Sequence, residues 1–485
     1  METEKRGLAG YLTIYVALSL TVMLSLCLTV IEGARRNSIE WEAECVMDVS
    51  MNSVMAEYHR EVLNQYNLLY IDSSYGSAYP SYYNTEARLK HYLEQNLNLQ
   101  EVSYVDFVYK DLLGMELADV WLKEVALATD LDGKLFQRKA AEASWDDSGM
   151  QTMENVLDWV QTIDSNGLLE RDIEAEKAAV DAKLEELQGT EKQLGNQKWV
   201  TVKVENPTQH LNDMRAKGVL RWILPEGSII SGQKVDLSQY ISARRKRGKI
   251  NEGNPGQISG ITPLESVLFH EYIVRYSGRY GAPKKGSLLQ YQTEYVIAGK
   301  DKDEENLRNV AMTISGLREV ANVIYLNNCS AKMDMVTIVA KVLAYAIFTP
   351  EAEGLFKASI VMGWAYLESV YDTKVLLAGG KIPLMKEDRD WHYDLDSIFT
   401  TANMEVKNQH KKGLAYVDYL RILLYLGNQE NITFRFMDLM EMDIRLTKGN
   451  EGFRMDGCIE RIGAQVVVKS GYGYEHVVES RKKYE

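Results

Sequence analysis

Acidic residues alternate with other residues in one short stretch. Of the sequence patterns in this chain, this spacing points most clearly to a chemical role, namely metal binding. Residues 387–396 carry Asp388, Asp390, His392, Asp394 and Asp396. In an extended strand these side chains share one face, because side chains alternate between two faces. Carboxylate oxygens are the ligands that Ca²⁺ prefers, but the EF-hand spacing is not met, since the twelfth residue from Asp388 is Phe399. The sequence is compatible with both a solvated acidic loop and a metal site, and it does not show whether a metal binds.

Familiar catalytic and nucleotide-binding motifs are not matched. Gly281–Ser287 resembles a phosphate-binding loop, but its lysines precede the second glycine and cannot reach a β- or γ-phosphate. Gly471-Tyr472-Gly473 lacks the third glycine of a dinucleotide-binding turn and fits a hairpin turn better. His270-Glu271 lacks the second histidine of a zinc helix, and no GxSxG sequence marks a nucleophilic serine. We therefore expect no catalytic residues, no cofactor and no enzymatic activity.

The four cysteines give no metal or redox motif. Cys27 and Cys45 lie near the N-terminus, whereas Cys329 and Cys458 are far apart, and no CxxC pair occurs. If the part of the chain after the apolar segment lies outside the cytoplasm, Cys329 and Cys458 are candidates for a disulfide.

The charge of the chain argues against nucleic acid as a partner. The net charge is −14, and residues 1–36 hold four basic and three acidic residues, so the remainder carries −15. Such a body repels phosphate backbones. The local exception is the basic run Arg244–Lys249, which reads as a solvated loop or as an anion-binding or protease-sensitive patch.

One segment is apolar and long enough to span a bilayer. Residues 10–31 contain no charge, and 22 helical residues rise about 33 Å, enough for the roughly 30 Å hydrocarbon layer. Glu32-Gly33-Ala34 follows instead of a small-x-small cleavage site, which favours an uncleaved anchor over a signal peptide. Basic pairs flank both ends (Lys5 and Arg6, Arg35 and Arg36), so the positive-inside rule leaves the orientation open.

Short sequences around this segment resemble a known group of proteins. Lys5-Arg6-Gly7, the apolar run, Ile31–Arg36 and Tyr58–Leu63 resemble the N-terminus of TadE/TadG-like pseudopilins. With Tyr66–Asp72 added, the start of the chain, to about residue 75, is similar to an uncharacterised bacterial family of membrane-anchored proteins encoded beside Tad (Flp) pilus assembly genes. The resemblance implies an exported body and a role in pilus assembly. Leu12 stands where prepilin peptidase substrates usually have glutamate, which argues for an accessory role rather than for processing into a filament.

Apolar spacing predicts that the membrane helix continues as a stalk. The positions recur at helical intervals and are Ile39, Ala43, Val46, Met47, Val54, Met55, Tyr58, Val62, Leu63 and Tyr66.

Mixed structure with a helix over 112–127 is expected next. Residues 151–196 then read as two helices around Ser165-Asn166-Gly167, which favours a local antiparallel pair over an oligomerising coiled coil. Met153, Val156, Leu157, Val160 and Ile163 line the first helix, and Ile173, Val180, Leu187 and Leu194 line the second.

The C-terminal part reads as helix-rich. Strand-like pieces such as Trp199–Val202 precede a domain boundary at Asn251–Gly256. Asp303 is expected to cap a helix, a second helix to run from Thr349-Pro350 to Gly379-Gly380, and a strand to form over Ala464–Lys469. The apolar runs 335–348 and 358–367 are short, so we expect buried helices there and no second crossing.

These observations predict an α+β fold in which one transmembrane helix continues into a stalk and a helix-rich extracytoplasmic body. The expected segments are a cytoplasmic tail (1–9), the transmembrane helix (10–31), stalk and first mixed unit (32–150), helical hairpin (151–196), strand and loop region (197–260) and C-terminal domain (261–485). The expected function is that of a non-catalytic accessory or minor pseudopilin-like component of a Tad-type pilus or secretion machine in the cell envelope. Its partners would be the lipid bilayer and other pilus or envelope proteins. The alternatives are a surface-displayed binding protein or adhesin and, third, a membrane-tethered hydrolase.

Overall fold

The computed structural model describes residues 2–77, 79–97, 113–145, 147–194, 198–216, 218, 220–225, 227–256, 260–400 and 412–484. The fold is α+β, as expected. The chain forms two compact units, and neither is continuous in sequence. The first unit contains Met1–Leu135, Ile250–Gly260 and Thr447–Glu485, and the second contains Phe136–Lys249 and Ile261–Leu446. The expected boundary at Asn251–Gly256 lies in the short segment that returns to the first unit.

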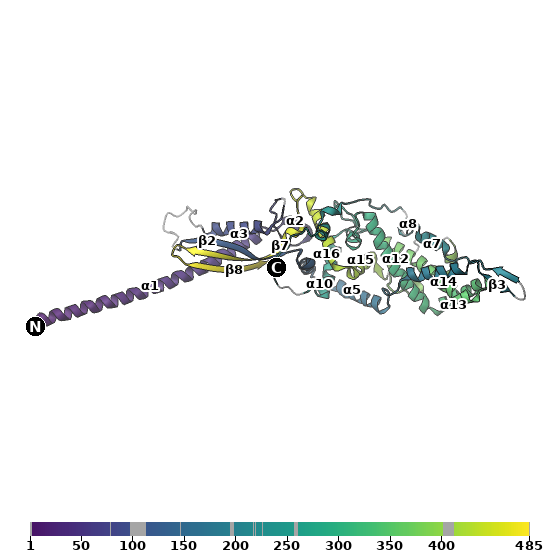
Figure 1. Cartoon of the computed structure of the whole chain (residues 1–485), viewed down its shortest axis with the longest axis horizontal. Coiled ribbons are helices and arrows are strands. Elements are labelled where there is room, and N and C mark those ends of the chain that lie inside the picture. The colour runs from purple at the N-terminus through teal and green to yellow at the C-terminus, as the bar shows by residue number, and fades with distance from the viewer. Residues whose placement is uncertain are drawn as a thin grey trace. The chain divides into compact units, whose positions relative to one another are not determined.

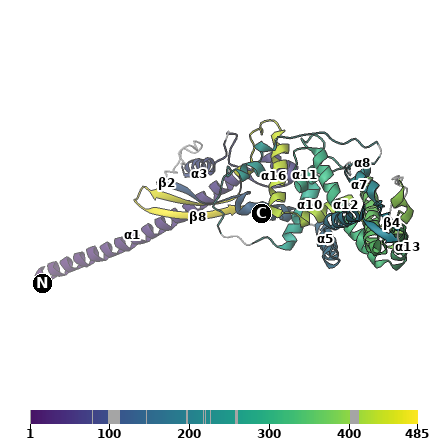
Figure 2. The same ribbon diagram turned by 45° about the vertical axis from the view of Figure 1, so that its right-hand side comes forward.

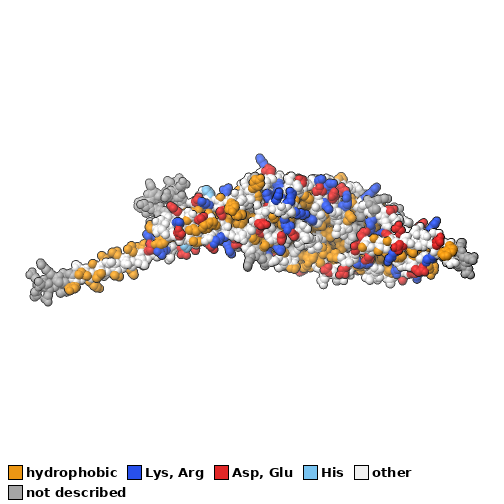
Figure 3. All heavy atoms as spheres, in the orientation of Figure 1, with side chains coloured by type: hydrophobic (Ala, Val, Ile, Leu, Met, Phe, Trp, Pro, Cys, Tyr) orange, Lys and Arg blue, Asp and Glu red, His pale blue; other side chains and the backbone are white. Residues whose placement is uncertain are grey.

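The first unit begins with one long helix, α1 (Glu2–Met55). Its side chains from Tyr11 to Ile31 are exposed and largely apolar, and Figure 3 shows this stretch covered by hydrophobic and uncharged groups. Within the described residues this is the one helix long and apolar enough to cross a membrane. The helix continues without interruption, and Ile39, Ala43, Met47, Met51 and Val54 are buried at helical intervals. The predicted stalk is therefore confirmed as far as Met55.

The helical pattern beyond Met55 belongs to a separate short helix. The chain leaves α1 at Ala56, and α2 (Arg60–Tyr66) begins after the N-cap residue His59. Asn67, in the left-handed region with φ +53°, ends α2, a conformation that asparagine tolerates better than most residues. Tyr58, Val62 and Tyr66 therefore do not extend the stalk as predicted.

A four-stranded antiparallel sheet packs beside α1. Strand β7 (Cys458–Ser470) pairs with β1 (Ile71–Asp72), β2 (Met115–Leu127) and β8 (Glu475–Lys483). Helices α1 and α3 (Tyr82–Leu97) pack on each other, α1 against β8 and α3 against β2, and both ribbon views show β8 alongside α1 (Figures 1 and 2). Apolar side chains from these elements form the core of the unit.

Strand β2 replaces the helix predicted over 112–127, so that prediction is wrong in its described part. The segment contains three leucines, two alanines, two glutamates and one lysine, which all favour helices. It instead pairs with β7 along its length, from Met115 opposite Ser470 to Leu127 opposite Ile459. A strand more than 300 residues away thus overrides the local preference. The strand predicted at Ala464–Lys469 is confirmed and is longer than expected.

The second unit is a helical assembly around α12 and α14 (Figure 1). Its helices are α5 (Asp147–Ser165), α6 (Ile173–Leu187), α7 (Gln209–Ala216), α8 (Leu220–Ile223), α9 (Ile241–Lys246), α10 (Pro263–Tyr276), α11 (Gln292–Ala298), α12 (Asp303–Asn328), α13 (Ser330–Ala346), α14 (Glu353–Leu377), α15 (Tyr416–Leu426) and α16 (Gln429–Arg445). Two small ladders join β3 (Glu191–Leu194) to β4 (Lys198–Thr201), and β5 (Lys381–Ile382) to β6 (Leu414–Ala415). Helix α4 (Asp130–Ala143) contains the point at which the chain passes between units.

Both helices predicted in 151–196 exist, but they do not form an antiparallel pair. Helix α5 packs against α10 and α15, whereas α6 packs against α14. Helix α6 ends at Leu187, and Leu194 lies in β3 instead of continuing the heptad pattern. Val156 and Val160 of α5 pack with Val267 of α10, whereas Ile173 and Leu184 of α6 belong to the larger core of the second unit.

Helix ends follow the predicted signals in part. Thr262 and Glu265 form a capping box at the start of α10. Pro350 opens a 3₁₀ turn before α14, and Gly379, at φ +85°, follows its end as predicted. Asp303 does not cap α12, because its carboxylate accepts hydrogen bonds from the backbone N–H groups of Gln290 and Tyr291. It therefore fixes the preceding loop.

Candidate functional site

The alternating acidic stretch is not an extended strand. Asp388–Asp390 and Leu395–Phe399 form two 3₁₀ turns, which points the side chains in different directions. Asp388 pairs with Lys332 at 2.9 Å, Asp390 accepts the backbone N–H of Glu387, and Asp394 and Asp396 are exposed. The imidazole of His392 stacks on the Tyr371 ring, with centroids 3.7 Å apart. The five side chains therefore do not share the face that an extended strand would give them. No group of three or more potential metal ligands occurs among the described residues.

The basic run is held by ion pairs rather than left free as a solvated loop. Its first half lies in α9, where Arg244 makes two contacts with the Glu441 carboxylate, at 2.6 and 2.9 Å. Arg245 pairs with Glu430, and Arg247 donates to the Ser238 carbonyl. Arg244 and Arg245 thereby attach α9 to α16, whereas Arg247 binds the turn that precedes α9. Lys246, Arg247 and Lys249 are exposed.

The cysteines are not cross-linked. Cys27, Cys45, Cys329 and Cys458 are all free thiols. The disulfide left open between Cys329 and Cys458 is therefore not formed. Cys458 is buried beside the Arg454 carbonyl and Met455, and it fills space in the core as a small apolar residue does.

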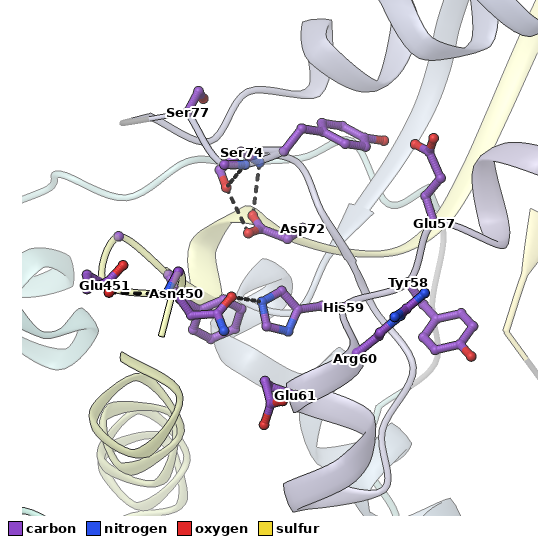
Figure 4. A pocket seen from close by; sticks show the side chains of 15 residues that line it. Glu57, Tyr58, His59, Arg60, Glu61, Asp72, Ser74, Ser77, Asn450 and Glu451 are labelled. Atoms are coloured by element: carbon purple, nitrogen blue, oxygen red, sulfur yellow. Dashed lines mark hydrogen bonds between the residues drawn. The ribbon is translucent and has the colours of Figure 1, made fainter. Parts of the chain in front are cut away.

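The first unit contains a polar pocket (Figure 4). Its volume is about 680 Å³. Three segments line it: the link between α1 and α2 (57–61), the turn after β1 (72–77) and the loop before β7 (449–453). The first two segments overlap the sequences Tyr58–Leu63 and Tyr66–Asp72, on which the resemblance to the pilus-associated family rests.

His59 lies at the centre of this pocket and is held at both ring nitrogens. Its Nδ1 accepts the backbone N–H of Val62 at 3.3 Å, which caps α2. Since Nδ1 accepts, Nε2 carries the proton and donates to Asn450 Oδ1 at 3.0 Å, as Figure 4 shows. The ring also packs on Phe453, with centroids 4.8 Å apart. The histidine thus links two segments of the pocket.

Four carboxylates line the pocket against one arginine, Arg60. Asp72 accepts the backbone N–H and hydroxyl of Ser74 at 2.9 and 2.7 Å. Glu57 accepts the Tyr92 hydroxyl at 2.7 Å, and Glu451 accepts the Gly449 N–H at 3.1 Å. Glu61, the fourth, accepts from the Gln65 amide on α2. No hydroxyl or thiol of the described pocket residues is hydrogen-bonded to His59, so the arrangement suits binding of a cationic group better than nucleophilic catalysis.

The sequence did not single out this pocket. Its segments are separated by about 370 residues between Ser77 and Gly449, and each residue has an ordinary local role as a cap, a turn or a loop. The family resemblance of residues 58–72 is the one sequence signal close to the pocket, and it gives no information about the segment 449–453.

A second unusual surface lies on α13. Val336, Ala340 and Ala344 are buried on one face, whereas Met335, Ile338, Val342 and Tyr345 are 50–65% exposed on the other. We call these four exposed residues the α13 stripe. The prediction of buried helices at 335–348 and 358–367 holds for the second run, which lies inside α14, but α13 is buried on one face only.

Comparison with known proteins places the chain in a family. The sequence profile of a family of unknown function (DUF5702) matches residues 197–470, more than half of the 485 residues. The chain belongs to this family. No curated protein and no solved structure matches it. The match confirms the expected relation to an uncharacterised family in its general form, and it carries no link to Tad pilus genes.

The DUF5702 segment includes the α13 stripe, the acidic stretch and strand β7. It begins after α1, so the membrane-compatible helix lies outside it, together with the pocket segments 57–61 and 72–77. The matched segment also runs through both compact units.

Proposed function

We propose that the chain is a non-catalytic, single-pass membrane protein that acts as an accessory or minor pseudopilin-like component of a Tad-type pilus or secretion machine. The observation that carries this proposal is the continuous helix α1, whose first half is apolar and exposed and whose second half is packed into the first unit.

The exposed half of α1 is suited to lipid. Large apolar residues from Tyr11 to Ile31 are 53–78% exposed, which in water would leave an apolar surface far larger than a typical single patch. Residues 11–31 rise about 30 Å as a helix, the thickness of the hydrocarbon layer. Because no break separates this half from the packed half, a membrane-inserted α1 would hold the first unit directly at the bilayer surface.

The pilus role is supported by the N-terminal resemblance and by a surface suited to partners. The sequences at 31–36, 58–63 and 66–72 resemble pseudopilins and proteins encoded beside Tad genes. Leu12 favours an accessory component over a processed filament subunit. The α13 stripe offers exposed apolar side chains on a helix whose opposite face is buried, a feature of protein–protein contact sites.

A surface-displayed binding protein is the second candidate, and the polar pocket of Figure 4 is the observation that favours it. Four carboxylates around about 680 Å³ fit a cationic ligand without any catalytic pair. A location of the gene beside Tad assembly genes would favour the pilus role over the adhesin role.

Deletion of the gene and substitution in the α13 stripe test the pilus role together. We expect deletion to reduce the number of surface pili counted by electron microscopy, and the full chain to restore it. The Ile338→Ser/Val342→Ser variant should fold and stay in the membrane but restore fewer pili, because the exposed apolar contact is weakened. The control is Met312→Ser on α12, an apolar residue that is 50% exposed, compared with 64% for Ile338 and 63% for Val342. Normal piliation in the deletion strain would contradict the proposal.

A further inference from the structure

We propose that the tip of the β7–β8 hairpin docks into the phospholipid headgroup layer of the bilayer that α1 spans. We define the hairpin tip as residues 470–474, and its contact region on α1 as Glu32, Arg35 and Arg36. This inference rests on the proposed membrane anchoring of α1, and it adds a second membrane contact made by the C-terminal part of the chain.

The hairpin tip contacts α1 directly after the apolar stretch. The Tyr474 hydroxyl donates to the Glu32 carboxylate, and Arg36 Nη2 donates to the Tyr474 oxygen at 3.2 Å. The Arg35 guanidinium lies 4.0 Å from the centre of the Tyr472 ring, and that of Arg36 lies 4.4 Å from the centre of the Tyr474 ring. Both partners belong to the first unit. A hairpin from the end of the chain is thereby fixed at the point where α1 becomes charged.

The height of this contact matches the headgroup layer. Ile31 is the last apolar residue of the stretch, and Arg35 and Arg36 follow four and five residues later. At 1.5 Å per residue they lie about 6–8 Å beyond it along the helix. A bilayer about 40–45 Å thick with a hydrocarbon core of about 30 Å has roughly 5–8 Å of headgroup on each side. The rings and guanidinium groups therefore fall at the level of the phosphates.

The residue types suit this layer. Tyrosine rings favour the membrane interface, because the ring is apolar and the hydroxyl can be solvated. Tyr472 is 50% exposed and Arg36 has 60% of its side chain exposed, so both have surface left for lipid. Guanidinium groups donate paired hydrogen bonds to phosphate oxygens. Two arginines against Glu32 leave one positive charge here, on a chain whose remainder would be repelled by anionic headgroups.

The turn itself limits how far the hairpin enters. Gly471 and Gly473 carry no side chain, and Gly473 adopts φ +81°, which a turn this tight requires. The next pair along the hairpin is Lys469 with Glu475, joined at 2.8 Å and more than half exposed. Because a solvated ion pair stays in water, the two tyrosines enter the headgroup layer and the strands above them do not. The contact would fix the tilt and rotation of the first unit on the bilayer.

The depth of the hairpin tip can be measured on the full chain in phosphatidylcholine/phosphatidylglycerol nanodiscs. A nitroxide label on Tyr472→Cys, in a chain with its native cysteines replaced, reports collisions with oxygen and with a water-soluble nickel complex. We expect several-fold less nickel accessibility than for a label on Tyr79→Cys. Tyr79 is 76% exposed in the same unit and precedes Pro80, which packs on Gly457 at the opposite end of β7. Equal nickel accessibility at both positions would overturn the inference.

A measurement on the unsubstituted chain guards against misfolding of the cysteine variants. Hydroxyl-radical oxidation of Tyr472, read by mass spectrometry and compared with Tyr79, should be several-fold slower in nanodiscs. The Arg35→Gln/Arg36→Gln variant should raise oxidation of Tyr472 and leave that of Tyr79 unchanged. A chain that does not enter nanodiscs at all would refute the membrane anchoring, whereas an embedded chain with a fully oxidised Tyr472 would refute docking of the tip alone.

Discussion

Buried charges of the second unit explain why the acidic stretch folds into turns instead of an extended strand. Lys386 Nζ lies 2.5 Å from the Glu368 carboxylate and 2.6 Å from that of Asp372, which also pairs with Arg318 at 3.1 Å. All four side chains are at most 1% exposed. Glu368 also accepts the backbone N–H groups of His392 and Tyr393 at 2.9 and 3.0 Å. The stretch that follows Lys386 is therefore folded around this network.

The sequence could not have predicted that network. Spacing alone made Asp388, Asp390 and His392 prominent, because alternation is visible in one segment. The residue that organises them, Glu368, lies in the middle of α14, where it merely interrupts an apolar run. Glu368 is bound by the loop after β5, whereas Asp372 on the same helix also pairs with Arg318 of α12. The balance of two cations and two carboxylates therefore exists only once the unit is folded.

Removal of the central cation should be costly. In Lys386→Met two buried carboxylates remain with one arginine, and breaking a buried pair from one side costs about 3–5 kcal/mol. Urea unfolding can be followed by fluorescence of Trp391, whose ring centre is 5.5 Å from Lys386 Nζ. The control Arg389→Ala removes an exposed pair with Glu387 and should change stability by less than about 1 kcal/mol. Similar stability for both variants would contradict a structural role of the network.

Glu294 should make the stability of the second unit depend on pH. Burial raises the pKa of its carboxyl from 4.5 to about 7, although Tyr280 N–H and the Tyr416 hydroxyl donate to Oε1 at 2.9 and 2.8 Å. Because the folded state holds the proton more tightly than the unfolded state, this stability is complete below pH about 4.5 and is lost as pH rises through about 7. The loss amounts to about 3 kcal/mol.

The isosteric Glu294→Gln variant separates this effect from general pH sensitivity. It keeps an oxygen for both donors but has no proton to lose, so we expect it to be more stable than the original chain at pH 8 and closer to it at pH 5. Thermal melting at each pH provides the measurement. Glu304→Gln, whose side chain is 48% exposed, is the matched control and should leave the pH profile unchanged. An unaltered profile in Glu294→Gln would show that other groups dominate.

At the scale of elements, sequence periodicity correctly predicted the helices and strands whose structure is determined by their own sequence. The apolar spacing after residue 31 correctly predicted that α1 continues, because a helix that buries one stripe must repeat apolar residues every three to four positions. The same reasoning failed for β2, whose composition favours a helix while its pairing with β7 decides the outcome. It also placed α5 against α6, because spacing shows that a face is apolar but does not show which element covers it.

The packed half of α1 offers a direct test of its amphipathic pattern. Met51 is fully buried in the core of the first unit, and Val49, two residues earlier, is 52% exposed. Met51→Ala should lower the free energy of unfolding by about 2–5 kcal/mol, as large-to-small core substitutions do. Val49→Ala should change it by less than about 0.5 kcal/mol. Equal effects in urea unfolding would mean that α1 is not packed in this register.

At the scale of the whole molecule, the order of segments along the chain does not match the order of folded units. The first unit takes its central strand β7 from the last 30 residues and a short segment from the middle of the chain. Composition marked the boundary at Asn251–Gly256, because glycine, proline and asparagine cluster there. It could not show that the chain returns to the first unit, since that depends on strand pairing between residues hundreds of positions apart.

This arrangement makes the orientation of the chain testable from its C-terminus. Strand β8 ends at Lys483 and lies beside α1 in the first unit, so an epitope added after Glu485 reports the side on which that unit lies. We expect that side to be outside the cytoplasm, as the pseudopilin resemblance implies. Protease added to cells with a permeabilised outer layer should remove the epitope, while a cytoplasmic control protein stays intact. After carbonate washing the full chain should remain with the membrane, whereas a chain lacking residues 1–33 should be soluble. A protected epitope on a carbonate-resistant chain would place the body in the cytoplasm and end the pilus proposal, yet leave the membrane anchor standing.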